Sequence, residues 1–161
     1  MKALSPSAQR VQDALNAAGI AATIVEYDVP ARTSAEAAAV LGCSVAQIAK
    51  SLVFRAASGA PVLVVASGAN RVDEAKVQTH VGETVRKADA AFVREVTGYA
   101  IGGIPPLAHR LPIVVLIDEG LLRYDHVFAA GGTPHAMFKI DAADLVRVSG
   151  GTPADVALFG A

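Results

Sequence analysis

Apolar residues near the N-terminus recur at a helical spacing. Val11, Leu15 and Ala18 stand three or four positions apart, so a helix places all three on one face. A serine and a proline precede this run, as is typical of an N-cap and a first helical turn, and a glycine follows it. The pattern therefore predicts a helix over residues 6–18.

Runs of β-branched and other apolar residues predict the strands. They cover residues 22–28, 51–56, 61–66, 113–118, 126–130 and 136–140. Ser58 and Gly59 separate the second run from the third, and a serine–glycine pair in this position is typical of a β-hairpin turn. We therefore expect an antiparallel pair over residues 51–66.

Further helices are predicted where a capping residue precedes helix-forming residues and a glycine follows them. Thr33 and Glu36 form one capping-box pattern, and Ser44 and Gln47 form another, which predicts a very short helix that ends at Lys50. The predicted segments are 33–41, 44–50, 73–81, 89–97, a turn near 121–124 and a last turn at 141–146, followed from Gly150 by a short peripheral tail.

The order of these elements favours one α+β domain over residues 1–161. Strands and helices are mixed without the regular alternation of a doubly wound fold, so we expect a mixed, largely antiparallel sheet surrounded by short helices. A chain of 161 residues is long enough for one full core and short for two. With 53% hydrophobic but only 5% aromatic residues, that core must consist mainly of aliphatic side chains.

Hydropathy and charge narrow the classes of partner. No apolar run reaches the ~18 residues that a membrane span needs, so we expect a cytoplasmic protein without a membrane partner. A net charge of −1 disfavours a protein that coats duplex DNA, since such binding neutralises many phosphates. Contact with one end of a nucleic acid stays open, and we expect a monomer or a weak homodimer.

The common catalytic and metal-binding patterns are missing from the sequence. Its single cysteine, Cys43, lies at a predicted helix junction and is a poor candidate nucleophile. The four histidines have no metal-ligand spacing, and neither a phosphate-binding glycine loop nor a serine-hydrolase motif occurs. We therefore expect no metal and no cofactor.

Glycine and proline are concentrated between residues 98 and 109. Gly102 and Gly103 permit positive φ and a close approach of a ligand to the backbone, whereas Pro105 and Pro106 stiffen the chain and remove donors. Such a loop can hold its remaining N–H groups toward an anion. A plain connection between a helix and a strand explains the same composition.

Two more side chains stand at places suited to a site. Lys50 precedes a buried-looking strand, where an unpaired ammonium is costly unless it faces a cleft or a partner; a lysine that extends along an edge to solvent is the alternative. His135 follows the turn Gly131-Gly132-Thr133-Pro134, from which a scaffold can present it to a ligand or only to solvent.

Three segments, taken together, carry a resemblance to a known family. They are Gln47-Ile48-Ala49-Lys50-Ser51-Leu52, Thr97-Gly98-Tyr99-Ala100-Ile101-Gly102-Gly103-Ile104-Pro105-Pro106-Leu107 and Ala130-Gly131-Gly132-Thr133-Pro134-His135. In this order and spacing they resemble the YbaK/EbsC family, which includes the inserted editing domain of bacterial prolyl-tRNA synthetase and its free-standing relatives. The resemblance spans about residues 7–148.

The resemblance implies an aminoacyl-tRNA deacylase, which hydrolyses the ester between a wrong amino acid and the 3′-terminal adenosine of tRNA. The acceptor end of an aminoacyl-tRNA is then the partner. Catalysis is implied for Lys50, Gly102 and Gly103. Substrate binding is implied for Tyr27, Ile104, Pro105, Pro106, Gly131, Gly132, His135 and Met137. Family members use a ribose hydroxyl of the substrate to help activate water, so no catalytic triad is needed.

Two departures from the family pattern bear on the substrate. Many members have serine before the last proline of the glycine–proline loop, where this chain has Pro105. Relatives closest to YbaK have an acidic residue near the position of Met137, and the Thr133-Pro134-His135 segment instead resembles deacylases that act on small amino acids. The resemblance thus implies trans-editing of a small amino acid. The alternatives are a noncatalytic module for a tRNA end or small molecule, and a hydrolase of a free metabolite.

Overall fold

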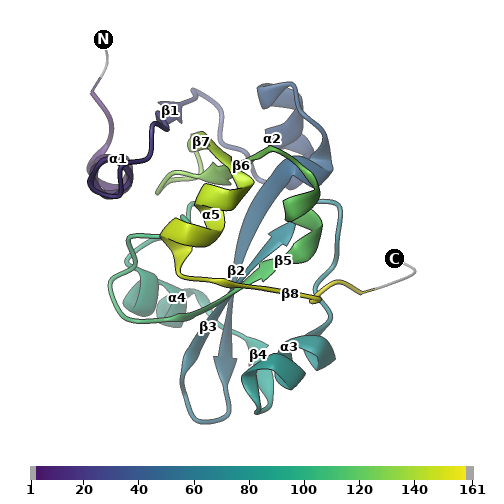
Figure 1. The fold of residues 1–161 in the computed structure, drawn as a ribbon. Helices are drawn as coiled ribbons and strands as arrows, with labels where there is room; N and C mark the ends of the chain where they lie inside the picture. Colours follow the sequence, from purple (N-terminus) through teal and green to yellow (C-terminus); the bar gives the residue numbers. More distant parts are fainter. Residues whose placement is uncertain (1–2, 159–161) are drawn as a thin grey trace.

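The computed structural model describes residues 3–158, which are built around an eight-stranded mixed sheet (Figure 1). The strands are β1 (Val25–Glu26), β2 (Ile48–Ala56), β3 (Pro61–Ser67), β4 (Val85–Lys87), β5 (Val114–Asp118), β6 (His126–Ala130), β7 (Ala136–Asp141) and β8 (Thr152–Ala154). Their order is β1-β7-β6-β2-β3-β5-β8, and β4 pairs with β2. Within the described residues four strand pairs are antiparallel and three are parallel, so the predicted α+β class with a mixed sheet is confirmed.

Short helices surround the sheet. They are α1 (Pro6–Ala17), α2 (Ser34–Leu41), α3 (Glu74–Val81), α4 (Ala90–Thr97) and α5 (Ala142–Ser149), with single-turn 3₁₀ segments η1 (Val45–Gln47) and η2 (Glu119–Arg123). Side-chain caps start three of them as predicted: Thr33, Asp73 and Asp89 each accept a backbone N–H of the first turn. No helix of residues 3–158 is long and apolar enough to cross a membrane.

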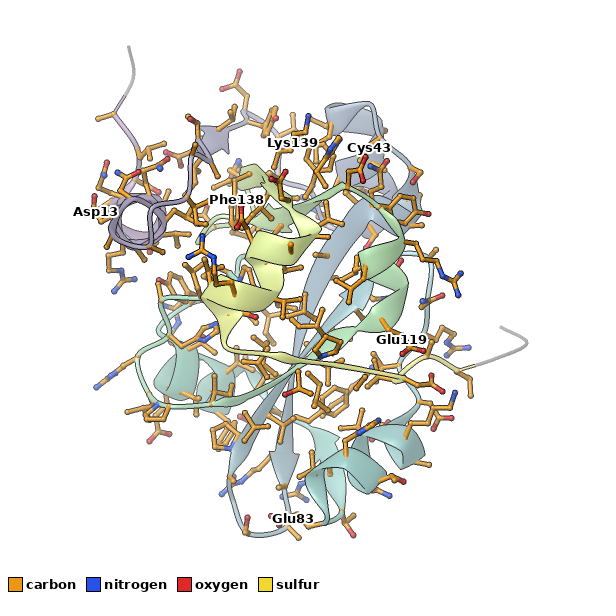
Figure 2. All side chains as sticks on the ribbon, in the orientation of Figure 1. Asp13, Cys43, Glu83, Glu119, Phe138 and Lys139 are labelled. Carbon is orange, nitrogen blue, oxygen red and sulfur yellow. The ribbon has the colours of Figure 1, made fainter. Side chains whose placement is uncertain are left out.

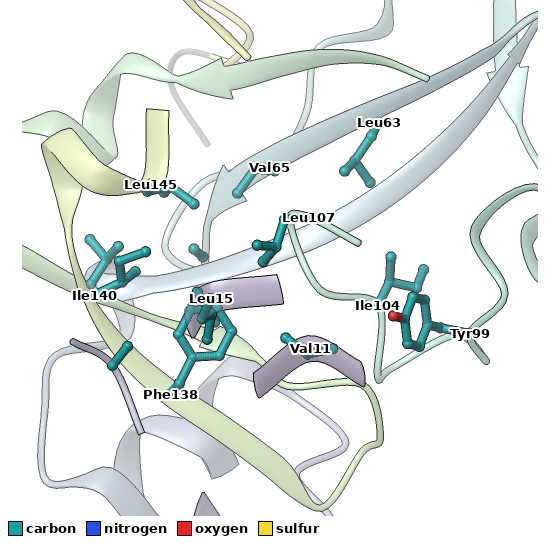
Figure 3. Packing of buried hydrophobic residues seen from close by; sticks show 14 of the residues in the cluster. Val11, Leu15, Leu63, Val65, Tyr99, Ile104, Leu107, Phe138, Ile140 and Leu145 are labelled. Atoms are coloured by element: carbon teal, nitrogen blue, oxygen red, sulfur yellow. The ribbon is translucent and has the colours of Figure 1, made fainter. Parts of the chain in front are cut away.

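The core lies on both faces of the central strand β3. Val62 and Val64 pack on one face in a cluster with α3, whereas Leu63 and Val65 pack on the other face in a cluster that includes residues of α1, α4 and α5. Figure 3 shows part of the second cluster, which also contains Ile104. A strand covered on both faces requires an unbroken apolar run, as residues 61–66 supply.

Strand β7 alternates between buried and exposed residues from Phe138 onward. In β7, Phe138 is 2% exposed, whereas the neighbouring Lys139 extends into solvent (Figure 2). This two-residue period directs Phe138 to the same cluster as Ile140.

Three predicted elements differ from the structure, and one strand was missed. The strand predicted over residues 22–28 is reduced to β1, and β4 was not predicted. Lys50 does not end a helix: η1 stops at Gln47 and β2 begins at Ile48, because β2 pairs with both β3 and β6 there. The C-terminal segment is not a peripheral tail, since β8 forms a parallel pair with β5.

Candidate active site

A cavity of about 360 Å³ lies between α2, the first half of β2 and the loop that follows α4. Its apolar wall consists of Ala31, Ala37, Ile48, Ala49, Leu52, Ile101, Ile104, Ala130 and Met137. Its polar wall consists of Arg32, Thr33, Ser34, Lys50 and Ser51, with Gly102 beside them. An apolar cavity with a few polar groups is the usual form of a small-molecule site.

A gap in the sheet creates this cavity. β2 pairs with β6 only through Ile48 and Ala49, and with β4 only from Phe54 onward. Between these points one edge of β2 has no neighbouring strand within the described residues, although the other edge pairs with β3. Residues 50–52 of this open stretch form part of the cavity wall.

A hydrogen-bond network holds Lys50 at the cavity. Its ammonium donates to the carbonyl of Asn70 at 2.8 Å. The Asn70 side chain donates to Asp118 Oδ2 at 3.0 Å, and Asp118 is only 2% exposed. The Asp118 carboxylate also accepts the N–H groups of Ser67 at 3.0 Å and of Gly120 at 2.9 Å. Lys50 is therefore tied, through one residue, to a buried negative charge.

The surroundings of Lys50 make its ammonium easier to deprotonate than an ordinary one. Burial lowers the pKa of Lys50 because the charged form loses solvation, and the positive charges of Lys87 and Arg71 lower it further. The negative charge of Asp118 opposes these effects. A half-buried lysine with a lowered pKa in a cavity is a candidate functional group.

The glycine–proline loop has two main-chain donors without a hydrogen-bond partner among the described residues. Gly103 N–H donates to the carbonyl of Ala100 at 3.0 Å and closes a β-turn. Gly102, the third residue of that turn, has φ +94°, which glycine adopts without strain. Gly102 and Ile104 line the cavity, and neither N–H donates a hydrogen bond to a described residue.

Three of the glycines expected at the site are buried and do not line the cavity. A Cβ atom on Gly103 would lie 2.6 Å from Thr133 Cα, and one on Gly132 would lie 2.7 Å from the Ser7 carbonyl oxygen. Gly132 N–H donates to the Gly103 carbonyl at 3.0 Å. Gly131 is buried beside them. Close packing against backbone explains Gly103 and Gly132, whereas a Cβ atom on Gly131 would lie 3.0 Å from the Ile24 side chain.

The two prolines of the loop are also buried behind it. The carbonyl of Pro105 lies 2.7 Å from Nε2 of His109, and Tyr99 donates from its hydroxyl to the Ala108 carbonyl at 2.9 Å. Burial lowers the pKa of His109, and the hydrogen bond to Pro105 partly opposes this. Pro105 and Pro106 therefore stiffen the loop from the core side and are not part of the cavity wall.

Tyr27 and His135 lie together beside the cavity. His135 Nδ1 is 3.0 Å from the Tyr27 carbonyl, and Tyr27 N–H donates to the His135 carbonyl at 2.8 Å. The two residues line one surface hollow, and His135 lines a second one with Gly102 and Arg32. His135 thus borders the cavity mouth, whereas Met137, Ile104 and Lys50 form the wall.

Sequence reasoning missed several residues of the site. Thr33 was predicted only as a cap, and Arg32, Ser34 and Ser51 were not predicted as site residues. Asp118 could have been recognised from the sequence, because it stands at the end of an apolar strand and a buried carboxylate there needs hydrogen-bond donors.

Cys43 does not line the cavity and follows α2 near the surface (Figure 2). Burial raises the pKa of its thiol, which disfavours the reactive thiolate. Within residues 3–158 no group of three or more histidine, cysteine, aspartate or glutamate side chains is placed to hold a metal ion.

The family is decided by a match of residues 28–148 to the aminoacyl-tRNA editing domain. The chain belongs to this family. The resemblance found in the three sequence segments is thereby confirmed, and tRNA editing is supported at the level of the family.

Three proteins of known sequence or structure are similar to this chain. A crystal structure described as a proposed trans-editing enzyme for prolyl-tRNA synthetase is 44% identical, has a TM-score of 0.91, and aligns over 97% of this chain and 99% of its own. The hypothetical protein APE2540 is 35% identical, with a TM-score of 0.86 and coverage of 92% and 99%. The uncharacterized protein YwhH of Bacillus subtilis (strain 168) is 31% identical over 78% of this chain and 80% of its own length.

Proposed function

We propose that the protein is a trans-acting editing hydrolase, which cleaves the ester between a wrongly attached small amino acid and the 3′-terminal adenosine of tRNA. The observation that carries the proposal is the cavity: in a chain of the editing-domain family, Lys50 and the Gly102 loop form parts of one cavity wall. The description of the 44% identical structure as a proposed trans-editing enzyme for prolyl-tRNA synthetase supports the same activity.

The size of the cavity supports a small substrate side chain. A volume of about 360 Å³ is near the lower end of the roughly 300–1,000 Å³ of ligand pockets. The ester and part of the terminal ribose must occupy some of this space. Ile48, Ile104 and Met137 then leave little room for a large amino acid.

The polar wall suits hydrolysis by water. Water adds to the ester carbonyl, whose oxygen gains negative charge, and the bond to the ribose oxygen then breaks as that oxygen takes up a proton. The Gly102 N–H is suited to stabilise the oxyanion, and the Lys50 ammonium to hold a phosphate or ester oxygen. No histidine, cysteine or carboxylate is among the described wall residues, so in this proposal water attacks without a protein nucleophile.

A deacylation assay tests the proposal. tRNAs charged with glycine, alanine, serine, cysteine, proline or phenylalanine are incubated with the protein, and spontaneous hydrolysis is subtracted. We expect turnover of at least one small aminoacyl ester. Lys50→Ala should reduce kcat/KM about ten- to a hundredfold, since it removes a charge-assisted contact. The matched control is Lys139→Ala, which removes an exposed lysine outside the cavity and should change the rate by less than about twofold.

Two outcomes would contradict the proposal. If the protein binds charged tRNA but hydrolyses none, it is a noncatalytic module for the tRNA end. If it hydrolyses simple aminoacyl esters as fast as the tRNA-linked ones, it is a hydrolase of free metabolites. A folded Lys50→Ala variant with the parent rate would refute the role of Lys50.

A further inference from the structure

The gap in the sheet leaves Ser51 with both main-chain groups directed to the open edge of β2. Successive residues of a strand direct their N–H and C=O groups to opposite edges. The carbonyl of Val53 faces the β4 edge, since it accepts the N–H of Ala88 at 3.1 Å. Ser51 stands two positions earlier, so its N–H and C=O face the same edge, where β6 has ended and β4 has not begun.

Ser51 also has an unsatisfied polar atom. The residue lines the cavity, and its hydroxyl oxygen is buried without a hydrogen-bond partner among the described residues. Nearly all buried hydroxyls in folded proteins have a partner, so an unpaired one indicates that another group completes the site. The open edge and the unpaired hydroxyl are independent observations that meet at one residue.

An aminoacyl ester is complementary to this edge. In an antiparallel hydrogen-bonded pair, two opposed residues exchange both of their N–H···O bonds. We propose that Ser51 binds the main-chain groups of the substrate amino acid in this way: its C=O accepts from the α-ammonium, and its N–H donates to the ester carbonyl. The amino acid adds to β2 as a single strand residue, as in β-augmentation. This inference rests on the proposed function, because that function defines the ligand.

The pairing assigns a place to the amino-acid side chain. Directly opposed residues of an antiparallel pair direct their side chains to the same face. Ala49 and Val53, which share the face of Ser51, pack in the hydrophobic cluster that contains Ile104. The substrate side chain is therefore on the Ile104 side of β2, whereas Lys50 extends from the opposite face. The Ser51 N–H becomes a second oxyanion donor beside that of Gly102.

Binding is tested without turnover by an analogue, 3′-amino-3′-deoxyadenosine that carries alanine through an amide bond. In ¹⁵N-labelled protein, the amide resonance of Ser51 should shift as the analogue is added. The matched control is the amide of Ser58, which already donates to Glu83 at 2.7 Å in the hairpin turn and should not shift. The N-acetylated analogue lacks the ammonium and should bind at least about tenfold more weakly.

Hydrolysis is tested with a pair of variants. Ser51→Pro removes the N–H on the open edge, where proline is tolerated because no ladder bond is lost, and Ser51→Ala removes the hydroxyl alone. The proline variant should lose about ten- to a hundredfold more kcat/KM than the alanine variant. Melting curves test whether both variants fold. If the proline variant does not fold, the analogue titrations alone decide whether Ser51 binds the substrate.

The subsite and the proposed function fail separately. If the protein hydrolyses N-acetylated and free aminoacyl-tRNA at equal rates, and the Ser51 resonance does not move at saturation, the subsite is refuted and the hydrolase stands. If the analogue shifts Ser51 but no ester is cleaved, the hydrolase is refuted and the subsite stands as a binding site.

Discussion

Replacing Asp118 by asparagine tests the network that positions Lys50. The carboxylate is 2% exposed and accepts three N–H groups, those of Ser67 and Asn70 on Oδ2 and that of Gly120 on Oδ1. An amide of the same size has a single acceptor oxygen. In its better orientation it retains the two bonds on one oxygen and turns its own NH₂ group toward the N–H of Gly120.

The cost of Asp118→Asn follows from these bonds. An N–H group left without its partner costs about 1–3 kcal/mol, toward the lower value here because Gly120 is partly exposed. The two retained bonds lose their charge assistance, about 0.5–1 kcal/mol each. We therefore expect the free energy of unfolding to fall by about 2–4 kcal/mol.

Urea-induced unfolding, followed by circular dichroism, measures this change. Asp144→Asn is the matched control, since it removes the same charge from an exposed pair with Arg147 at 3.2 Å. Such pairs contribute little, so the control should lose less than about 1 kcal/mol.

The same variant should change the pH dependence of hydrolysis. Asp118 opposes the burial that lowers the pKa of Lys50, so without this carboxylate the pKa of Lys50 falls further. If the ammonium is required, activity is lost as the pH rises through that pKa. The alkaline limb of kcat/KM, corrected for spontaneous hydrolysis, should therefore begin at a lower pH in Asp118→Asn. A variant with the stability and the alkaline limb of the parent would refute the network.

Other substitutions separate the site from the scaffold. Gly102→Ala places a side chain at φ +94°, so kcat/KM should fall at least about tenfold. If the loss of activity is explained by a loss of folded protein in the melting curve, the loop has only a structural role. Ile104→Ala enlarges the cavity, so hydrolysis should extend to larger amino acids while the free energy of unfolding falls by about 2–4 kcal/mol. An unchanged amino-acid preference in a competition assay would contradict the assigned side-chain pocket. Cys43→Ser should leave the deacylation rate within about twofold of the parent, and a tenfold loss in a folded variant would show that the thiol takes part.

The sequence by itself determined the elements that local interactions define. Val11 and Leu15 stand at helical spacing, and Thr33 accepts the N–H of Glu36, so the positions of α1 and α2 could be predicted. The unbroken apolar run of β3 and the hairpin after β2 were equally readable, because burial on both faces and a tight turn each require particular residues nearby. The order of the three motif segments was sufficient for the family.

Only the tertiary structure decided where strands begin and end. The capping pattern of η1 favours a helix as far as Lys50, but pairing of β2 with β3 and β6 converts residues 48–50 to strand. β8 has a threonine, a proline and an alanine, and it is a strand because β5 offers an open edge. Hydrogen bonds between distant segments outweigh weak local preferences in both places.

The composition of the site was decided in the same way. Lys50 and Gly102 could be proposed from sequence, but their place on one cavity wall depends on how the chain folds. The open edge at Ser51 exists because the pairing of β2 with β6 ends at Ala49 and its pairing with β4 begins at Phe54. The residues next to Ser51 in the sequence do not determine where β6 ends or where β4 begins. Asp118 acts on Lys50 through Asn70, across long separations in the chain. The cavity is formed by segments that are distant in the sequence, so its polar groups can be recognised only when the structure shows which residues lie next to them.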